Sequence, residues 1–240
     1  MAKITTLFVD KGGVLVNNDE LGAQYQRLIA EYLPRILGGE PTGWADANVW
    51  AFDRQWARWE AAARSPATMT IREWFDADAA KWLYDMCEMV RVPRPPEKDA
   101  VRIANDTLRY VRERVGIQVP GIVDRLRAFR DRGLTLHVAS GDAHDDLQEY
   151  LTTIGARDLF DRVYGSDLIN VWKSSADYYR AILADTGVDP ASAIVIDDSE
   201  RAIGWARECG LRGVLVRRGP GEPFEQAVIR AFDEVDRALA

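Results

Sequence analysis

Two short stretches decide the fold of this chain, LFVDKGGVLV at residues 7–16 and IVIDDSERAIGWARECGLRG at residues 194–213. Each opens with a short apolar run that ends in carboxylates, Asp10 in the first stretch and Asp197 with Asp198 in the second. Apolar runs of about four to eight residues bounded by polar residues are typical of buried strands. The sequence therefore predicts that both acidic positions lie at the ends of strands inside a sheet.

The chain from Val119 onward alternates short apolar runs with helical patterns. Predicted strands lie at residues 4–9, 134–139, 162–164, 193–196 and 213–216. Five helices are predicted between and after these strands. The first starts at Gly121, the second passes through Tyr150, the third runs from Ser174 to about Asp185, the fourth from Ser199 to Cys209, and the last continues past Glu222. This alternation is typical of an α/β fold with a parallel sheet.

The segment at residues 19–115 has no comparable β runs, and we expect it to be a helical insert between residues 1–18 and residues 116–240 of a core domain. It carries six of the eight tryptophans in helix-favouring surroundings. Spacings such as Trp56 with Trp59, or Trp74 with Tyr84, are interpreted as packing between helices, although such a cap would also line a pocket with its aromatic rings.

Composition excludes several classes of protein. With 38 acidic and 31 basic residues the formal net charge is -7, which argues against nucleic acid as a partner. No apolar stretch reaches the roughly 18 residues that a membrane span requires, so we expect a cytoplasmic protein with no membrane partner. The spacing of Cys87 and Cys209 matches neither a zinc site nor a disulfide framework. We expect a monomer or a homodimer.

Polar residues follow the predicted strands at matching places. Asp10, Ser140 and the Asp197–Asp198 pair come directly after apolar runs, and Lys173 follows the strand at residues 162–164. Ligands of open parallel sheets bind beyond the carboxyl ends of the strands, so we expect these side chains to converge. A carboxylate nucleophile, a hydroxyl, an ammonium and an acidic pair together suit a divalent cation and a phosphoryl group.

Four motifs resemble those of the haloacid dehalogenase-like superfamily. LFVDKGGVLV resembles the first motif and VAS at residues 138–140 the second, while VWKSSADYY at residues 171–179 and IVIDDSERAIGWARECGLRG resemble the third and fourth. The resemblance covers the core domain nearly end to end, and the first and fourth motifs are specific as a pair. It implies a Rossmann-like core with a helical cap inserted after the first strand.

The resemblance also implies an activity, a Mg²⁺-dependent phosphatase that forms an aspartyl-phosphate from a small phosphorylated molecule. On this basis Asp10 attacks the substrate, Ser140 and Gly141 bind its phosphoryl group, and Lys173 offsets the negative charge. The implied metal ligands are Asp10, the backbone carbonyl of Gly12, Asp198 and, as an auxiliary, Asp197.

Two positions depart from the family pattern. Gly12 stands where family phosphatases carry a second Asp that protonates the leaving group, and general acid/base help of this kind is worth about 10²- to 10⁴-fold. Ala202 stands where relatives often carry another Asp or Asn of the metal site. The first departure predicts slow turnover, and the second predicts a reduced set of metal ligands.

Three further residues near the motifs were interpreted from local pattern. Strand alternation directs Lys11 away from Asp10, which predicts a structural or surface role. His144 lies just past Ser140, where it either starts a helix or reaches the site as a proton donor. His137 falls inside a predicted strand and is expected to be packed.

Alternative functions remain open at this stage. The 2-haloacid dehalogenases of the family also lack the second Asp and need no metal, but the Asp197–Asp198 pair counts against that reading. Phosphonate-cleaving relatives use a cap lysine, for which Lys81 and Lys98 are the candidates in the insert. In a non-catalytic alternative, the fold keeps a ligand or partner but has lost turnover with Gly12.

Overall fold

The computed structural model describes residues 3–65 and 68–239, and within these ranges it contains a five-stranded parallel sheet. The strands are β1 (Thr6–Val9), β2 (Thr135–Ala139), β3 (Arg162–Tyr164), β4 (Ala193–Asp197) and β5 (Arg212–Leu215). Their spatial order is β3-β2-β1-β4-β5, which places β1 at the centre. This arrangement confirms the predicted α/β fold, with each strand within about two residues of its predicted position.

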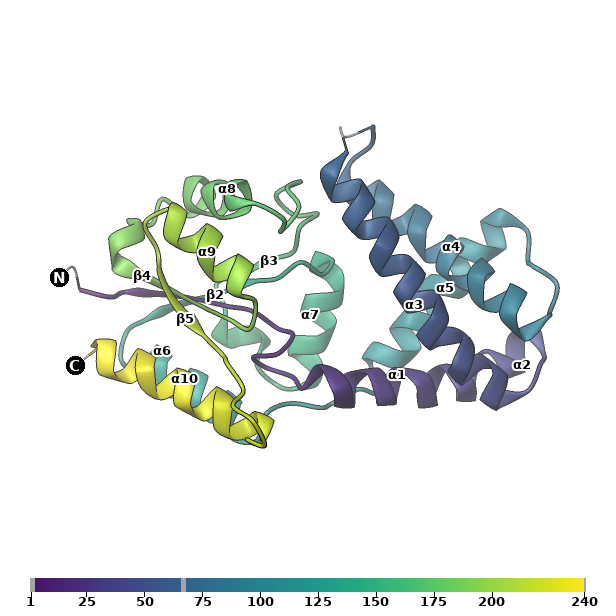
Figure 1. Ribbon diagram of the computed structural model, residues 1–240, viewed down its shortest axis with the longest axis horizontal. Helices are drawn as coiled ribbons and strands as arrows, with labels where there is room; N and C mark the ends of the chain where they lie inside the picture. The colour runs from purple at the N-terminus through teal and green to yellow at the C-terminus, as the bar shows by residue number, and fades with distance from the viewer. Residues whose placement is uncertain (1–2, 66–67, 240) are drawn as a thin grey trace. The chain divides into compact units, whose positions relative to one another are not determined.

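Helices cover both faces of this sheet (Figure 1). They are α6 (Ile122–Asp131), α7 (His144–Thr153), α8 (Ala176–Thr186), α9 (Glu200–Glu208) and α10 (Phe224–Leu239). Helices α8 and α9 lie on one side of the sheet, and α6 and α10 lie together on the other. Because both faces are covered, the central strands β1 and β4 are buried throughout and read as continuous apolar runs.

The face beneath α8 and α9 carries a well-defined apolar core. Phe8 of β1 packs there with Tyr178 and Ile182 of α8 and Ile203 of α9. Helix α8 then ends at Thr186, because Gly187 adopts a left-handed conformation with a φ of 66° and its N–H bonds back to Leu183.

The chain divides into two compact units, one comprising the residues up to Asn18 and those from Ile117 onward, the other residues 19–116. The second unit is helical, as the sequence predicts. Its elements are α1 (Asn18–Tyr32), α2 (Pro34–Leu37), α3 (Pro41–Arg64), α4 (Ile71–Val90) and α5 (Glu97–Arg112). Two short 3₁₀ segments, Arg157–Leu159 and Pro190–Ser192, complete the first unit.

Tryptophans play two different roles in the helical unit. Trp44 is fully buried and its indole N–H donates to Gly38 O at 2.8 Å, while Trp82 is buried and donates to Asn48 Oδ1 at 3.2 Å. Trp56 is 50% exposed and stacks on Trp59 with ring centroids 5.0 Å apart. The interpretation of Trp56 as core was therefore wrong, because its ring finds a partner one turn along the same helix.

Cys87 is a buried free thiol, whereas Cys209 is a partly exposed one. In the part of the chain that the structure describes, no helix combines the length and the apolar character that crossing a bilayer requires.

The two tryptophans of α3 form a matched pair for a stability test. Trp44→Ala is expected to lower the free energy of unfolding by about 3–5 kcal/mol, because it leaves a cavity and an unpaired Gly38 carbonyl. Trp56→Ala is expected to cost less than about 1.5 kcal/mol, since it removes mainly a surface ring pair. Urea denaturation of both variants measures the difference, and equal losses would contradict this description of the helical unit.

Candidate active site

Side chains from several loops meet at the carboxyl edge of the parallel sheet. Asp10 directly follows β1 and Ser140 directly follows β2, while Asp197 ends β4. The hydrogen bonds between strands extend to Asp10 and Ser140. The Asp10 N–H donates to Ile196 O, and the Ser140 N–H donates to Tyr164 O, each at 3.0 Å. Main-chain bonding thus fixes these residues to the sheet rather than leaving them in mobile loops.

Lys173, in the loop between β3 and α8, is the central cation of this edge. Its Nζ lies 2.7 Å from Asp197 Oδ2 and 3.1 Å from Asp10 Oδ1, and it donates to Ala139 O at 2.8 Å. Only 8% of the side chain is exposed. The ammonium therefore joins the ends of β1, β2 and β4, and the convergence predicted for Lys173 with the two carboxylates is present.

Burial and charge shift the pKa values of this group in opposite directions. Burial, reinforced by Asp197 and Asp198, raises the pKa of Asp10 to about 7, although Lys173 acts to lower it. Burial alone would lower the pKa of Lys173, yet Asp10 and Asp197 together hold it well above its usual range. Lys173 is thus a permanent cation, while Asp10 is a carboxylate that ionises near neutrality.

Asp10, Asp197 and Asp198 offer carboxylate oxygens that all lie within 4.8 Å of one another. Burial, together with the neighbouring Asp197, raises the pKa of Asp198. Three oxygen donors at this separation suit a hard divalent cation such as Mg²⁺, which would neutralise their repulsion. The residues present thus fit the expected metal, and the carboxylate of Asp197 is additionally held by Ser199 N–H at 2.8 Å.

The loop after β1 closes tightly under Asp198. Leu15 N–H donates to Lys11 O and Gly13 N–H donates to Val16 O, both at 2.9 Å. Gly13 has a φ of 66°, and a Cβ there would lie 1.9 Å from Asp198 Oδ2. A Cβ at Gly12 would meet only the Asn18 side chain, at 3.0 Å. Position 13 therefore requires glycine, whereas position 12 does not.

Ser140 and Gly141 belong to a second tight loop, after β2. Ser140 is buried, and its Oγ lies 3.5 Å from Asp142 N. Two residues that the sequence analysis did not assign support this loop. Ser166 Oγ donates to Gly141 O at 3.3 Å, and Tyr178 OH donates to Ser140 O at 2.9 Å. The signal for Ser166 was available, because it too follows a strand, β3.

Lys11 has a structural partner rather than a surface position. Its Nζ lies 2.5 Å from Asp142 Oδ2 and 5.6 Å from the centroid of the Tyr150 ring, and 12% of the side chain is exposed. The ion pair links the loop after β1 to the loop after β2. Of the two roles proposed for Lys11, the structural one agrees with this geometry and the surface one does not.

Neither histidine belongs to the group of Asp10, Asp197 and Asp198. His144 is the first residue of α7, with its N–H on Asp167 Oδ1 at 2.7 Å, its Nδ1 2.8 Å from Val163 O and its Nε2 3.1 Å from Gln148. Both ring nitrogens are thus engaged by the protein, which favours the helix-start role over the proton donor. His137 is packed within β2, as expected, and stacks on Phe8.

Three further residues considered from the sequence remain. Ala202 is buried within α9 and offers no ligand atom. Lys81 of α4 and Lys98 of α5 are exposed side chains of the helical unit.

Comparison with known proteins gives a consistent family match. Over residues 4–210 the chain matches the family described as haloacid dehalogenase-like hydrolase. It is 32% identical to enolase-phosphatase E1 of Marinobacter nauticus over 130 residues, which cover 50% of this chain and 53% of that protein. It is 31% identical to phosphoglycolate phosphatase of Caulobacter vibrioides over 124 residues, 50% of this chain and 52% of the relative. The chain spans about half the length of the curated relatives it matches.

Solved structures resemble the chain over nearly all of its length. The L-2-haloacid dehalogenase from Xanthobacter autotrophicus superposes with a TM-score of 0.59 and 19% sequence identity, covering 99% of this chain and 84% of that one. At this level of identity the likeness shows the fold and leaves the chemistry open.

The raised pKa of Asp10 predicts that this residue costs stability in the absence of metal. Between about pH 4 and pH 7 the folded state binds one more proton than the unfolded state, so stability falls as pH rises through that window. Asp10→Asn removes this cost and is expected to raise the free energy of unfolding by about 1–4 kcal/mol at pH 8, with a smaller gain at pH 5. Urea denaturation in a chelating buffer measures both values.

Asp142→Asn is the matched control, because its expected effect on the free energy of unfolding at pH 8 is opposite to that of Asp10→Asn. Burial would raise the pKa of Asp142, but Lys11 holds it below its usual value, so the ionised carboxylate stabilises the fold above about pH 4. The variant should therefore lose stability at pH 8. If Asp10→Asn were destabilising at pH 8 as well, ion pairing with Lys173 would outweigh burial at Asp10.

Proposed function

The chain belongs to the haloacid dehalogenase-like hydrolase family, and we propose that it is a Mg²⁺-dependent phosphatase of small organic phosphates with Asp10 as its nucleophile. The observation that carries this proposal is the group of three carboxylates, Asp10, Asp197 and Asp198, at the carboxyl edge of the sheet. A cluster of negative charge at this place repels an anionic substrate unless a cation offsets it. That requirement favours a metal-assisted reaction over metal-free displacement.

Sequence relatives support the same class of reaction. The two curated relatives described above are both named as phosphatases, although the matched regions cover about half of each. We further propose that the unit built on the sheet is the catalytic core and that residues 19–116 form its cap. Specificity would then depend on side chains of the helical unit, while the chemistry depends on the core.

The proposed reaction has two displacements at phosphorus. In the first, an oxygen of Asp10 forms a bond to phosphorus while the ester P–O bond breaks, and the alkoxide leaves and takes a proton from solvent, giving an aspartyl-phosphate. In the second, water attacks phosphorus and gives a proton to solvent, the bond between phosphorus and the Asp10 oxygen breaks, and phosphate departs with the Asp10 carboxylate restored. Lys173 holds Asp10 through a 3.1 Å ion pair and offsets charge on the phosphoryl oxygens, which Ser140 and Gly141 would bind.

Bound Mg²⁺ would supply charge neutralisation between the nucleophile and the phosphoryl group. We propose Asp10, the Gly12 carbonyl and Asp198 as its ligands, with Asp197 as an auxiliary. The carboxylate of Asp197 already accepts from Lys173 and Ser199, which limits it to this secondary role.

Phosphate release from a panel of small phosphate esters, with and without Mg²⁺, tests the proposal. The native protein is expected to release phosphate only with Mg²⁺, and Asp10→Asn is expected to lose at least about 10³-fold in rate because the nucleophile is gone. Asp131→Asn, at an exposed position of α6, is the matched control and should retain full activity.

Other outcomes of the same assay point to other activities. Halide release from 2-haloacids without metal would replace this proposal with dehalogenation, and cleavage of phosphonates would replace it with the phosphonate-cleaving class. An absence of turnover on every substrate class, with retained binding of inorganic phosphate, would support the non-catalytic alternative.

Gly12 predicts a dependence on the leaving group. Without an acid at this position, esters of poorly acidic alcohols should turn over far more slowly than aryl esters such as p-nitrophenyl phosphate. Gly12→Asp is expected to accelerate alkyl phosphates by about 10- to 100-fold and aryl phosphates much less, because protonation helps only a poor leaving group. Comparing kcat for the two ester types in both proteins measures the effect.

Gly13→Ala is the matched control for the loop. Its Cβ would collide with Asp198 at a position where φ is 66°, so we expect loss of activity for both ester types. Equal acceleration of alkyl and aryl esters by Gly12→Asp would contradict an acid/base role at position 12.

A further inference from the structure

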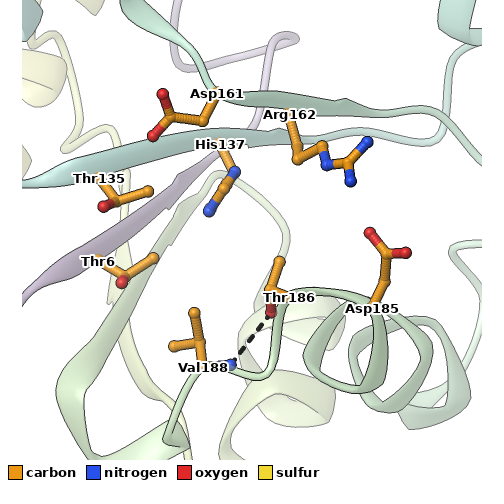
Figure 2. A pocket seen from close by; sticks show the side chains of 8 residues that line it. All are labelled: Thr6, Thr135, His137, Asp161, Arg162, Asp185, Thr186 and Val188. Atoms are coloured by element: carbon orange, nitrogen blue, oxygen red, sulfur yellow. Dashed lines mark hydrogen bonds between the residues drawn. The ribbon is translucent and has the colours of Figure 1, made fainter.

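A polar cavity of about 340 Å³ opens at the amino edge of the sheet, opposite to Asp10 (Figure 2). Residues from the start of three strands and from the end of α8 surround it. They are Thr6, Thr135, His137, Asp161, Arg162, Asp185, Thr186 and Val188. Because Thr6 begins the strand that Asp10 follows, the cavity and the carboxylate group lie at opposite ends of β1. No group assigned to the proposed phosphatase reaction lines it.

Strand register and the length of α8 together create this cavity. Thr6 pairs with Thr135, and His137 pairs with Phe8 and Arg162, so their side chains share the face that α8 covers. The helix ends at Thr186, and its last residues, Asp185 and Thr186, line the cavity together with the polar side chains of this face.

His137 is a buried side chain in the wall of the cavity. The residue is 4% exposed, and its Nδ1 has no hydrogen-bond partner among the residues that the structure describes. Its ring, stacked on Phe8 at 5.2 Å, points into the space between Thr6, Thr186 and Arg162 (Figure 2). Because Nδ1 is itself buried, it is not within reach of a molecule in the cavity, and the His137 ring contributes a flat wall beside the threonine hydroxyls.

Charges at the rim define the chemistry of that molecule. Arg162 takes part in none of the ion pairs found within residues 3–65 and 68–239, whereas the neighbouring Asp161 is paired with Arg130 at 2.8 Å. Asp185 accepts from Tyr164 OH through Oδ2, which leaves Oδ1 for a second donor. Arg162 and Asp185 extend toward the same space (Figure 2). A cation and a carboxylate side by side complement a ligand that carries both charges.

We propose that this cavity binds a free α-amino acid or a zwitterion of similar size. Its carboxylate would lie on the Arg162 guanidinium and its ammonium on Asp185, while other polar atoms of the ligand face the Thr6 and Thr135 side chains. The volume suits a molecule of about ten heavy atoms. The proposal is one of binding, and it stands independently of the phosphatase reaction because no residue assigned to that reaction lines the cavity.

Titration of the ¹⁵N-labelled full-length chain with a panel of amino acids tests this site by NMR. The expected result is a saturable shift of the Thr6, Thr135 and His137 signals with at least one amino acid. The corresponding carboxylic acid without its ammonium group, and the amine without its carboxylate, are expected to bind at least about 10-fold more weakly. Equal binding of the acid alone, or no shift with any amino acid, overturns the proposal.

Two arginines provide a matched pair of variants. Arg162 and Arg212 are both exposed first residues of edge strands, β3 and β5, but only Arg162 lines the cavity. Arg162→Gln is expected to weaken binding at least about 10-fold, and Arg212→Gln is expected to leave it unchanged. Spectra that stay native-like away from the site show that each variant is folded. Undiminished binding by folded Arg162→Gln overturns the assignment.

Discussion

The ion pairs of Lys173 with Asp10 and Asp197 are the interaction on which the carboxyl edge of the sheet depends. Parallel strands bring their ends together, and here they bring three carboxylates within 4.8 Å. A single buried ammonium, 2.7 Å from one carboxylate and 3.1 Å from another, keeps that concentration of charge compatible with folding. One cation does not balance three carboxylates, which is why burial and mutual repulsion raise the pKa values of Asp10 and Asp198.

Much of this arrangement follows from the sequence by one rule, that polar residues directly after buried strands share an edge. The rule places Asp10, Ser140 and the acidic pair because main-chain pairing fixes each strand end. It does not give side-chain partners. Alternation showed that Lys11 points away from Asp10, but the partner, Asp142, comes from a loop whose path depends on tertiary contacts.

The helical unit was predictable as an insert but not in its packing. Aromatic spacing along α3 does not distinguish Trp44, which is buried, from Trp56, which stacks on Trp59 at the surface. The polar cavity could not be predicted from the sequence either, because it depends on where the end of α8 packs along the strands beneath it. His137 was expected to be packed, yet its unpaired nitrogen becomes visible only once that packing is known.

The central position of β1 has a consequence for how the chain assembles. Thr6 pairs with Thr135 on one side and with Ala193 on the other, so β1 is synthesised about 130 and 190 residues before the two strands that flank it. Residues 19–116 form a compact unit from one continuous segment and can fold during that interval. The sheet can therefore close only after most of the chain has been made, and β1 stays without its neighbouring strands until then.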